Sequence, residues 1–232
     1  MLAAVATFAA PAAAQDAKSN TSFTGSLGYL SASGNTKLTT LSIGEALGHT
    51  TGRWMLSQLV AYVYGKTDAR ESANQLRVAA RADYSFEARL GLFGGTSVER
   101  NRYAGFRRRT EQIAGLKWKA IVAPADSMAL DAGGVLTRQS DVDGKSASYT
   151  SGRVATVYKH VFSKAAYFHQ FVEYLPSTKE AGYRLNAESA VVAPISRHVG
   201  IKLDHVTRYN SRPPVNFGTT DRVLTMGVQL SY

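Results

Sequence analysis

The feature that most constrains the fold is an alternation of apolar and polar side chains, which recurs between turn-forming residues along most of the chain. Such a period of two is typical of β-strands whose two faces meet different environments. The pattern is clearest at residues 74–86 and returns at 183–192 and 221–232. In the first segment one face carries Asn74, Leu76, Val78, Ala80, Ala82, Tyr84 and Phe86, and the other carries Gln75, Arg77, Ala79, Arg81, Asp83 and Ser85.

Clusters of Gly, Pro, Asn, Asp and Ser divide the chain into twelve predicted strands. They cover residues 21–32, 37–49, 53–66, 72–86, 90–100, 109–122, 127–138, 148–162, 165–175, 182–193, 198–209 and 220–232. The second, third and ninth strands have no clean parity. Short connections, such as 50–52 and 87–89, are interspersed with long ones at 101–108, 139–147 and 210–219. Short periplasmic turns and longer outer loops would give this pattern, with both termini on the periplasmic side.

A soluble β-sandwich or a lipocalin-like barrel also alternates, so the period alone does not decide between these folds. The predicted strands are longer than the roughly 5 or 6 residues usual in soluble sheets and match the roughly 9 to 11 residues of a tilted membrane span. Aromatic residues such as Trp54, Tyr84, Tyr183 and Tyr209 gather near predicted strand ends, as in the aromatic girdles of membrane barrels. We therefore predict an all-β, transmembrane, antiparallel up-and-down β-barrel of about twelve strands, occupying residues 21–232 as one domain in the bacterial outer membrane.

The two ends of the chain carry candidate export and assembly signals. Residues 1–14 are uncharged and apolar and end in Ala12, Ala13 and Ala14, which predicts a signal peptide cleaved after Ala14 and a short segment at 15–20, although the usual basic n-region is missing. An Ala-rich helix of the mature fold is the alternative. The final strand resembles the terminal signal read by the barrel-assembly machinery, unless its aromatic end is a coincidence. The residues that carry this signal are Gly227, Leu230 and Tyr232.

Composition excludes several classes of protein. No segment after Ala14 has the roughly 20 consecutive apolar residues of a spanning helix. The absence of cysteine excludes disulfide-stapled folds and thiol or Cys-based zinc chemistry. The net charge of +10, from 27 Lys and Arg against 17 Asp and Glu, would ordinarily suggest nucleic acid. Because the basic residues are mostly spread singly along strands, we do not expect a nucleic-acid partner.

Several local sequences carry a family resemblance. They are the turn Ser33-Gly34-Asn35-Thr36, the stretch Glu99-Arg100-Asn101 followed by Phe106-Arg107, and Tyr209-Asn210 followed by Pro213-Pro214. Together they resemble the bacterial family catalogued as domain of unknown function 481 (DUF481), whose members are often labelled YdiY-like or salt-induced outer-membrane proteins. The resemblance covers residues 21–232 and implies an outer-membrane barrel, with no catalytic residues to carry over.

The motifs of common enzyme classes are absent. The chain has no P-loop, no G-x-G-x-x-G after a strand and no G-x-S-x-G elbow. His169 and Glu173 share a strand face but stand roughly 13 Å apart, too far to ligate one ion. A Ser-His-carboxylate triad assembled across strands is the remaining enzymatic alternative, although His205 fits an interfacial histidine better. We expect no enzyme activity, metal or cofactor.

The polar parity of the strands predicts a charged barrel interior. The lumen-facing residues are expected to be Arg77, Arg81, Asp83, Glu111, Lys117, Lys119, Asp131, Arg153, Lys159, Arg184, Glu188, Lys202, Asp204, Arg208 and Asp221. Barrels of eight strands are filled by side chains and those of sixteen or more hold a water channel, so twelve strands allow either a narrow pore or a plug of ion pairs. The leading hypothesis is limited passage of small solutes with a preference for anions.

A second cluster of cations surrounds the predicted loop at 101–108. Its members are Arg100, Arg102, Arg107, Arg108 and Arg109. Because guanidinium groups bind phosphate and carboxylate in bidentate fashion, the cluster predicts an anion or lipopolysaccharide contact at the outer leaflet. The alternative is a solvated loop paired locally with Glu99 and Glu111. A non-conducting barrel that binds lipopolysaccharide through its loops is accordingly the second functional hypothesis, and an enzyme is the third.

Overall fold

A computed structural model describes residues 20–32, 38–163, 166–177, 182–196, 198–214 and 217–231. The predicted signal peptide, the turn Ser33-Gly34-Asn35-Thr36 and Tyr232 lie outside these residues. The described chain forms twelve strands and one short 3-10 helix, η1(Arg102–Ala104). The strands are β1(Asn20–Ala32), β2(Leu38–Thr51), β3(Trp54–Thr67), β4(Arg70–Ser85), β5(Leu90–Asn101), β6(Phe106–Val122), β7(Asp126–Asp141), β8(Ser146–Val161), β9(Tyr167–Pro176), β10(Tyr183–Pro194), β11(Val199–Asn210) and β12(Thr220–Ser231).

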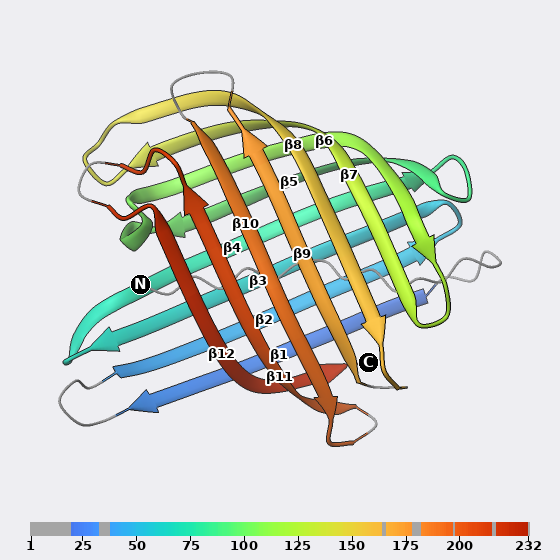
Figure 1. The fold of residues 1–232 in the computed structure, drawn as a ribbon. Helices are drawn as coiled ribbons and strands as arrows, with labels where there is room; N and C mark the ends of the chain where they lie inside the picture. Colours follow the sequence, from blue (N-terminus) through green and yellow to red (C-terminus); the bar gives the residue numbers. More distant parts are fainter. Residues whose placement is uncertain are drawn as a thin grey trace.

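The strands form one closed barrel in which every strand pairs with its neighbours in sequence and β12 pairs with β1 (Figure 1). The pairs are antiparallel, so the barrel has an up-and-down topology. Because closure pairs both margins of the sheet, it leaves no free edge. The predicted fold class is confirmed. No helix in the described residues has the length and apolar character needed to cross a membrane.

The observed strand bounds agree with the predicted ones to within three residues, and the largest differences lie around β6 and β7. The turn residues at 101–108 suggested that the sixth strand begins at residue 109, but β6 begins at Phe106, which is buried and already paired with Asn101 and Asp141. The β3–β4 connection is also tighter than expected. It consists of Asp68 and Ala69, both with positive φ, which is the conformation of a two-residue type I′ hairpin turn.

The outward face of the barrel is apolar along its middle. Val78, Leu92 and Leu116 are 42%, 49% and 57% exposed, although each stands within a regular strand. Aromatic clusters lie at the two ends of the barrel. Trp54 and Tyr84 contact each other at one end, and Tyr183 lies between Tyr174 and Tyr209 at the other. An apolar band flanked by aromatic groups is what a membrane-spanning barrel presents to lipid.

The seam that closes the barrel is built on close backbone contact between β1 and β12. Five register pairs run from Thr24 opposite Ser231 to Gly28 opposite Gly227. A Cβ atom on Gly227 would stand 2.4 Å from the carbonyl oxygen of Leu27 and 2.8 Å from the Cα of Gly28. Gly227, which the sequence analysis assigned to the terminal assembly signal, therefore also has a packing role in barrel closure.

Candidate functional site: the barrel interior and its outer mouth

The interior is the candidate site, because strand parity turns the charged side chains inward. The structure puts all eleven of the principal predicted lumen charges at strand positions that alternate with the exposed apolar ones. They are Arg77, Arg81 and Asp83 on β4, Lys117 and Lys119 on β6, Arg153 on β8, Arg184 and Glu188 on β10, and Lys202, Asp204 and Arg208 on β11. The additional expected positions Glu111, Asp131, Lys159 and Asp221 have the same inward parity.

A network of ion pairs fills the middle of the lumen and is centred on Asp131 of β7. Asp131 accepts hydrogen bonds from Arg81 Nη1 at 2.7 Å and from Arg153 Nη1 at 3.0 Å. Arg81 also pairs with Asp83, and Arg153 pairs with Glu173, each at 2.7 Å. Because Arg81 stands on β4 and Asp131 on β7, the network connects strands that are not neighbours in the sheet. Each buried charge in it is thereby offset by an opposite one.

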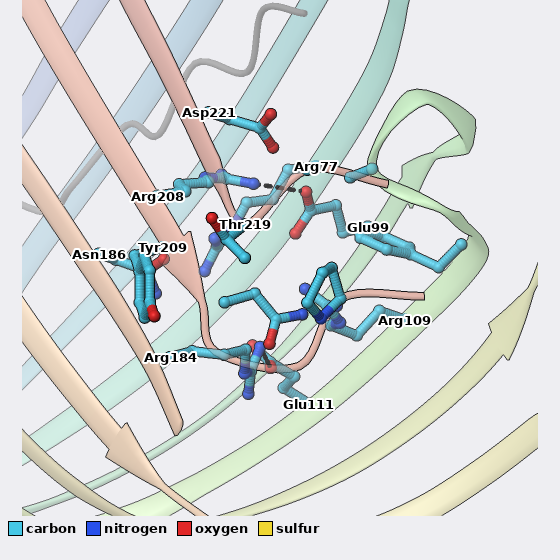
Figure 2. A pocket seen from close by; sticks show the side chains of 15 residues that line it. Arg77, Glu99, Arg109, Glu111, Arg184, Asn186, Arg208, Tyr209, Thr219 and Asp221 are labelled. Atoms are coloured by element: carbon cyan, nitrogen blue, oxygen red, sulfur yellow. Dashed lines mark hydrogen bonds and ion pairs between the residues drawn. The ribbon is translucent and has the colours of Figure 1, made fainter. Parts of the chain in front are cut away.

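A second layer of ion pairs spans the lumen near its outer mouth (Figure 2). Arg208 Nη1 on β11 donates to Glu99 Oε1 on β5 at 2.7 Å, and Gln75 Nε2 donates to the same oxygen at 2.7 Å. Arg184 Nη1 on β10 pairs with Glu111 Oε1 on β6, also at 2.7 Å. The strands β5 and β11 are six positions apart in the ring of twelve, so the Arg208–Glu99 pair joins opposite walls of the barrel.

A cavity of about 50 Å³ lies within this layer (Figure 2). Its charged lining consists of four arginines and three carboxylates, with the connection between β11 and β12 on one side. The charged lining residues are Arg77, Arg109, Arg184, Arg208, Glu99, Glu111 and Asp221. Ala104, Phe106 and Pro213 add an apolar margin. The site is therefore cationic, small and close to the outer end of the strands.

The β11–β12 connection reaches the turn between β5 and β6. A Cβ atom on Gly105 would lie 2.7 Å from Pro214 Cγ and 3.0 Å from Phe217 Cδ2, so both residues pack directly on Gly105. Gly105 has a φ of 87° and its carbonyl accepts a hydrogen bond from the N–H of Val142 in the next connection. Three connections are therefore joined at this end of the barrel.

The β5–β6 turn is also held against β4. The Tyr103 hydroxyl donates within 3.0 Å of both the carbonyl oxygen and Oε1 of Glu71. Partial burial raises the pKa of Tyr103, and its hydrogen bond to Glu71 raises it further. The tyrosine therefore stays protonated and able to donate at neutral pH.

The wall formed by β1 and β2 differs from the rest of the interior because its inward side chains are small. Ser26, Ser42 and Gly44 face inward and remain partly exposed. A second cavity, of about 40 Å³, lies against these residues and reaches Lys202 and Asp204 on β11. The two charged residues pair with each other at 3.2 Å. This side of the lumen is therefore polar but carries no charged side chain of its own.

The predicted arginine cluster at 100–109 divides between two surfaces. Arg100, Arg102, Arg107 and Arg108 are exposed. Arg107 Nη2 donates to the carbonyl oxygen of Val142. A register shift between Phe106 and Arg108 precedes Arg109, which turns into the lumen, donates to Gln139 and lies over the Phe106 ring at 3.9 Å.

Sequence reasoning missed two members of the interior that the structure brings together. Glu99 was considered a partner of the loop arginines, yet it pairs with Arg208 across the barrel. Glu173 was considered only as a metal ligand with His169, yet it accepts hydrogen bonds from Arg153 and Asn186. The parity of their own strands was a usable signal, because both alternate with outward apolar residues.

The metal alternative gains no site in the described residues, and the serine in register with His205 has another partner. They contain no group of three or more His, Cys, Asp and Glu side chains that could hold a metal ion. His205 stands on the outward face of β11, in register with Ser189 of β10 and Leu224 of β12. Ser189 Oγ donates to Gln170 Oε1 at 2.6 Å, an interaction that gives its hydroxyl proton a partner other than His205.

A closed barrel of twelve antiparallel strands, apolar outside and charged within, defines the class as an outer-membrane-type β-barrel with a porin-like fold. The chain belongs to the family described as "Protein of unknown function, DUF481", whose model matches residues 25–232. The family predicted from its local sequences is thus confirmed. It is 28% identical to the uncharacterized protein YdiY of Escherichia coli (strain K12) over 208 residues, which are 88% of this chain and 80% of YdiY.

Two solved structures illustrate the similarity of fold. One is an outer membrane channel from Pseudomonas putida F1, with a TM-score of 0.54, 10% identity, and coverage of 95% of this chain and 97% of that one. The other is the translocator domain of the autotransporter NalP from Neisseria meningitidis, with a TM-score of 0.51, 11% identity, and coverage of 94% and 88%. At these identities the likeness concerns the fold.

Proposed function

We propose that this protein is an integral bacterial outer-membrane barrel that gives small solutes a narrow, gated and weakly anion-preferring passage. The observation that carries the proposal is the uneven filling of the lumen. Long charged side chains project from β4 through β11, whereas β1 and β2 contribute Ser26, Ser42 and Gly44. The apolar outward band with aromatic groups at both ends supports residence in the outer membrane.

The path would follow the β1–β2 wall. Ser42 and Gly44 point into the barrel yet keep part of their surface accessible, whereas Leu59 and Val63 on the neighbouring strand β3 are 1% exposed. Hydroxyl groups and backbone along such a wall offer water and small solutes polar contacts without placing a fixed charge there. The charges of the opposite wall then set the electrostatic potential of the path.

The gate would be the outer mouth. The Arg208–Glu99 pair crosses the lumen, and Pro214 and Phe217 of the β11–β12 connection pack on Gly105 of the β5–β6 turn. Both features narrow the same end of the barrel. Their movement would open the passage without any change in the barrel wall.

The anion preference rests on the balance of charge at the mouth. Four arginines and three carboxylates line the cavity there. Arg208, Arg184 and Arg109 each have a polar side-chain partner, whereas Arg77 Nε is buried with no hydrogen-bond acceptor. A cation with no acceptor for its N–H group favours a mobile anion over a mobile cation.

The experiment that tests the proposal is single-channel recording of the refolded protein in planar bilayers. We expect small conductance steps and a reversal potential in a KCl gradient that favours chloride. Arg77→Gln should reduce the preference, whereas Arg100→Gln, which removes an exposed cation at the same end of the barrel, should leave it unchanged. Absence of conductance in several lipid mixtures, for both the parent and a Glu99→Gln/Arg208→Gln variant, would refute the passage.

A closed barrel that binds lipopolysaccharide is the second candidate, and the exposure of Arg100, Arg102, Arg107 and Arg108 favours it. These four side chains lie where outer-leaflet phosphates would be available to them. The test is lipopolysaccharide binding by an Arg107→Gln/Arg108→Gln variant at two salt concentrations, with Arg109→Gln as the lumen-facing control. Unchanged affinity and unchanged salt dependence would identify these residues as a solvated turn.

A further inference from the structure

We propose that the cavity at the outer mouth is a binding site for a small oxyanion, such as the carboxylate of a short organic acid, held by Arg77 and Arg208. This inference rests on the proposed function, because the site lies where a solute would enter the lumen. Binding to the site does not itself require conduction, so the two are tested by different measurements.

Three guanidinium nitrogen atoms of Arg77 and Arg208 have no acceptor for their N–H groups. Arg208 uses Nη1 for Glu99, but its Nε and Nη2 atoms are buried and have no hydrogen-bond partner in the described structure. Arg77 Nε is buried in the same way. Both residues line the cavity. Buried guanidinium N–H groups without acceptors are costly, so the site favours a ligand that accepts hydrogen bonds.

The three carboxylates that line the cavity, on Glu99, Glu111 and Asp221, do not satisfy these donors, which have no hydrogen-bond partner in the described structure. Glu99 Oε1 accepts from both Arg208 and Gln75, and Glu111 Oε1 accepts from Arg184 and, at 3.5 Å, from Thr137. The orphaned donors of Arg77 and Arg208 are therefore left for a group that the protein itself does not supply. A carboxylate or phosphate oxygen matches the geometry of a guanidinium group better than water does.

The cavity is small, and part of its lining is apolar. A single water molecule needs roughly 10 to 15 Å³ of such space. The cavity of about 50 Å³ therefore accommodates only a few waters or one ion of a few heavy atoms. Ala104, Phe106 and Pro213 line part of the cavity and suit the methyl or methylene end of a short carboxylic acid. Pro213, Gly218 and Thr219 of the β11–β12 connection also line the site. A lipid headgroup with attached acyl chains fits this enclosure poorly.

The test is nuclear magnetic resonance of arginine-labelled protein in detergent micelles, with acetate and inorganic phosphate as probes at constant ionic strength. The Nε–H signals of Arg77 and Arg208, assigned with the two Arg→Gln variants, should shift and saturate with one dissociation constant. Loss of one charge-assisted contact in Arg77→Gln should weaken binding about tenfold. Arg100→Gln is the matched control, because Arg100 lies outside the lumen opposite Leu76, and it should bind as the parent does.

A second variant, which should bind acetate more tightly than the parent, distinguishes loss of the site from a folding defect. Glu99→Gln removes the carboxylate that competes for Arg208, so it should tighten acetate binding several-fold in a protein whose mobility still changes on heating in SDS. Shifts that grow linearly without saturation would show that the cavity holds only water. Equal affinities in the parent and in Arg77→Gln would show that the anion binds at another site. Either result would overturn the proposal. A response to lipopolysaccharide but not to acetate or phosphate would also overturn the proposal.

Discussion

Arg208 on β11 and Glu99 on β5 face each other from opposite walls of the barrel and meet at 2.7 Å. Their side chains are 13% and 6% exposed, so the pair is largely withdrawn from water. A buried pair of this kind contributes little net stability, but removing one partner leaves an uncompensated charge. The same pair crosses the lumen near its outer mouth.

A double-mutant cycle tests this pair. Glu99→Gln alone should lower the free energy of unfolding in detergent by about 3 kcal/mol, because Arg208 is then left buried without its partner. Arg208→Gln/Glu99→Gln should recover part of that loss and raise the single-channel conductance, since no charge pair then crosses the mouth. Additive single effects in urea unfolding would mean that the two side chains do not interact.

Arginine scanning of the outward face tests the orientation of β4. Val78→Arg should cost about 2 to 4 kcal/mol in unfolding free energy, because Val78 stands mid-strand in the apolar band. Leu76→Arg should cost about 1 kcal/mol or less, since Leu76 pairs with Arg100, which already puts a guanidinium at that height. Equal and small costs at both positions would contradict a lipid-facing β4.

Gly105 tests whether the β11–β12 connection closes the mouth. Gly105→Ala adds a methyl group where Pro214 Cγ stands 2.7 Å away and Phe217 Cδ2 stands 3.0 Å away, so the connection should be displaced and chymotrypsin should cleave after Phe217 faster. Gly144→Ala is the matched control, because Gly144 has a φ of 89° but no atom within 4 Å of the added methyl. If both variants are cleaved at the same rate, backbone strain rather than the contact with Pro214 explains the change.

Gly227 tests the closure of the barrel. Gly227→Ala should destabilise the barrel by about 1 to 3 kcal/mol, because the added methyl would overlap the backbone of β1 at Leu27. The same change at Gly134, where the nearest atom lies at 3.9 Å, should have little effect. The measurement is the temperature at which the folded band converts to the unfolded band in SDS electrophoresis. A Gly227 variant that converts with the parent would exclude a packing role.

The alternation of residues 74–86 was enough to orient β4, because neighbouring side chains on a strand point to opposite faces whatever the strand pairs with. The same local rule gave the inward parity of Arg77, Arg81 and Arg208, and the turn-forming residues gave the number of strands and most of their bounds. It was less informative in β3, where Leu59 and Val63 face inward while Leu56 and Val60 face outward, so both faces are apolar.

Pairing across the lumen was decided only by the tertiary structure. Glu99 and Arg208 are 109 residues apart, and nothing local to either of them indicates that closure of twelve strands brings them together. The inward turn of Arg109 after the register shift near Phe106, and the packing of Pro214 on Gly105, likewise became visible only in the tertiary structure. A strand fixes the direction of its own side chains, but their partners depend on the curvature and register of the whole barrel. The sequence by itself therefore determined a barrel with a charged interior, whereas the tertiary structure decided where that interior is crossed, covered and left open.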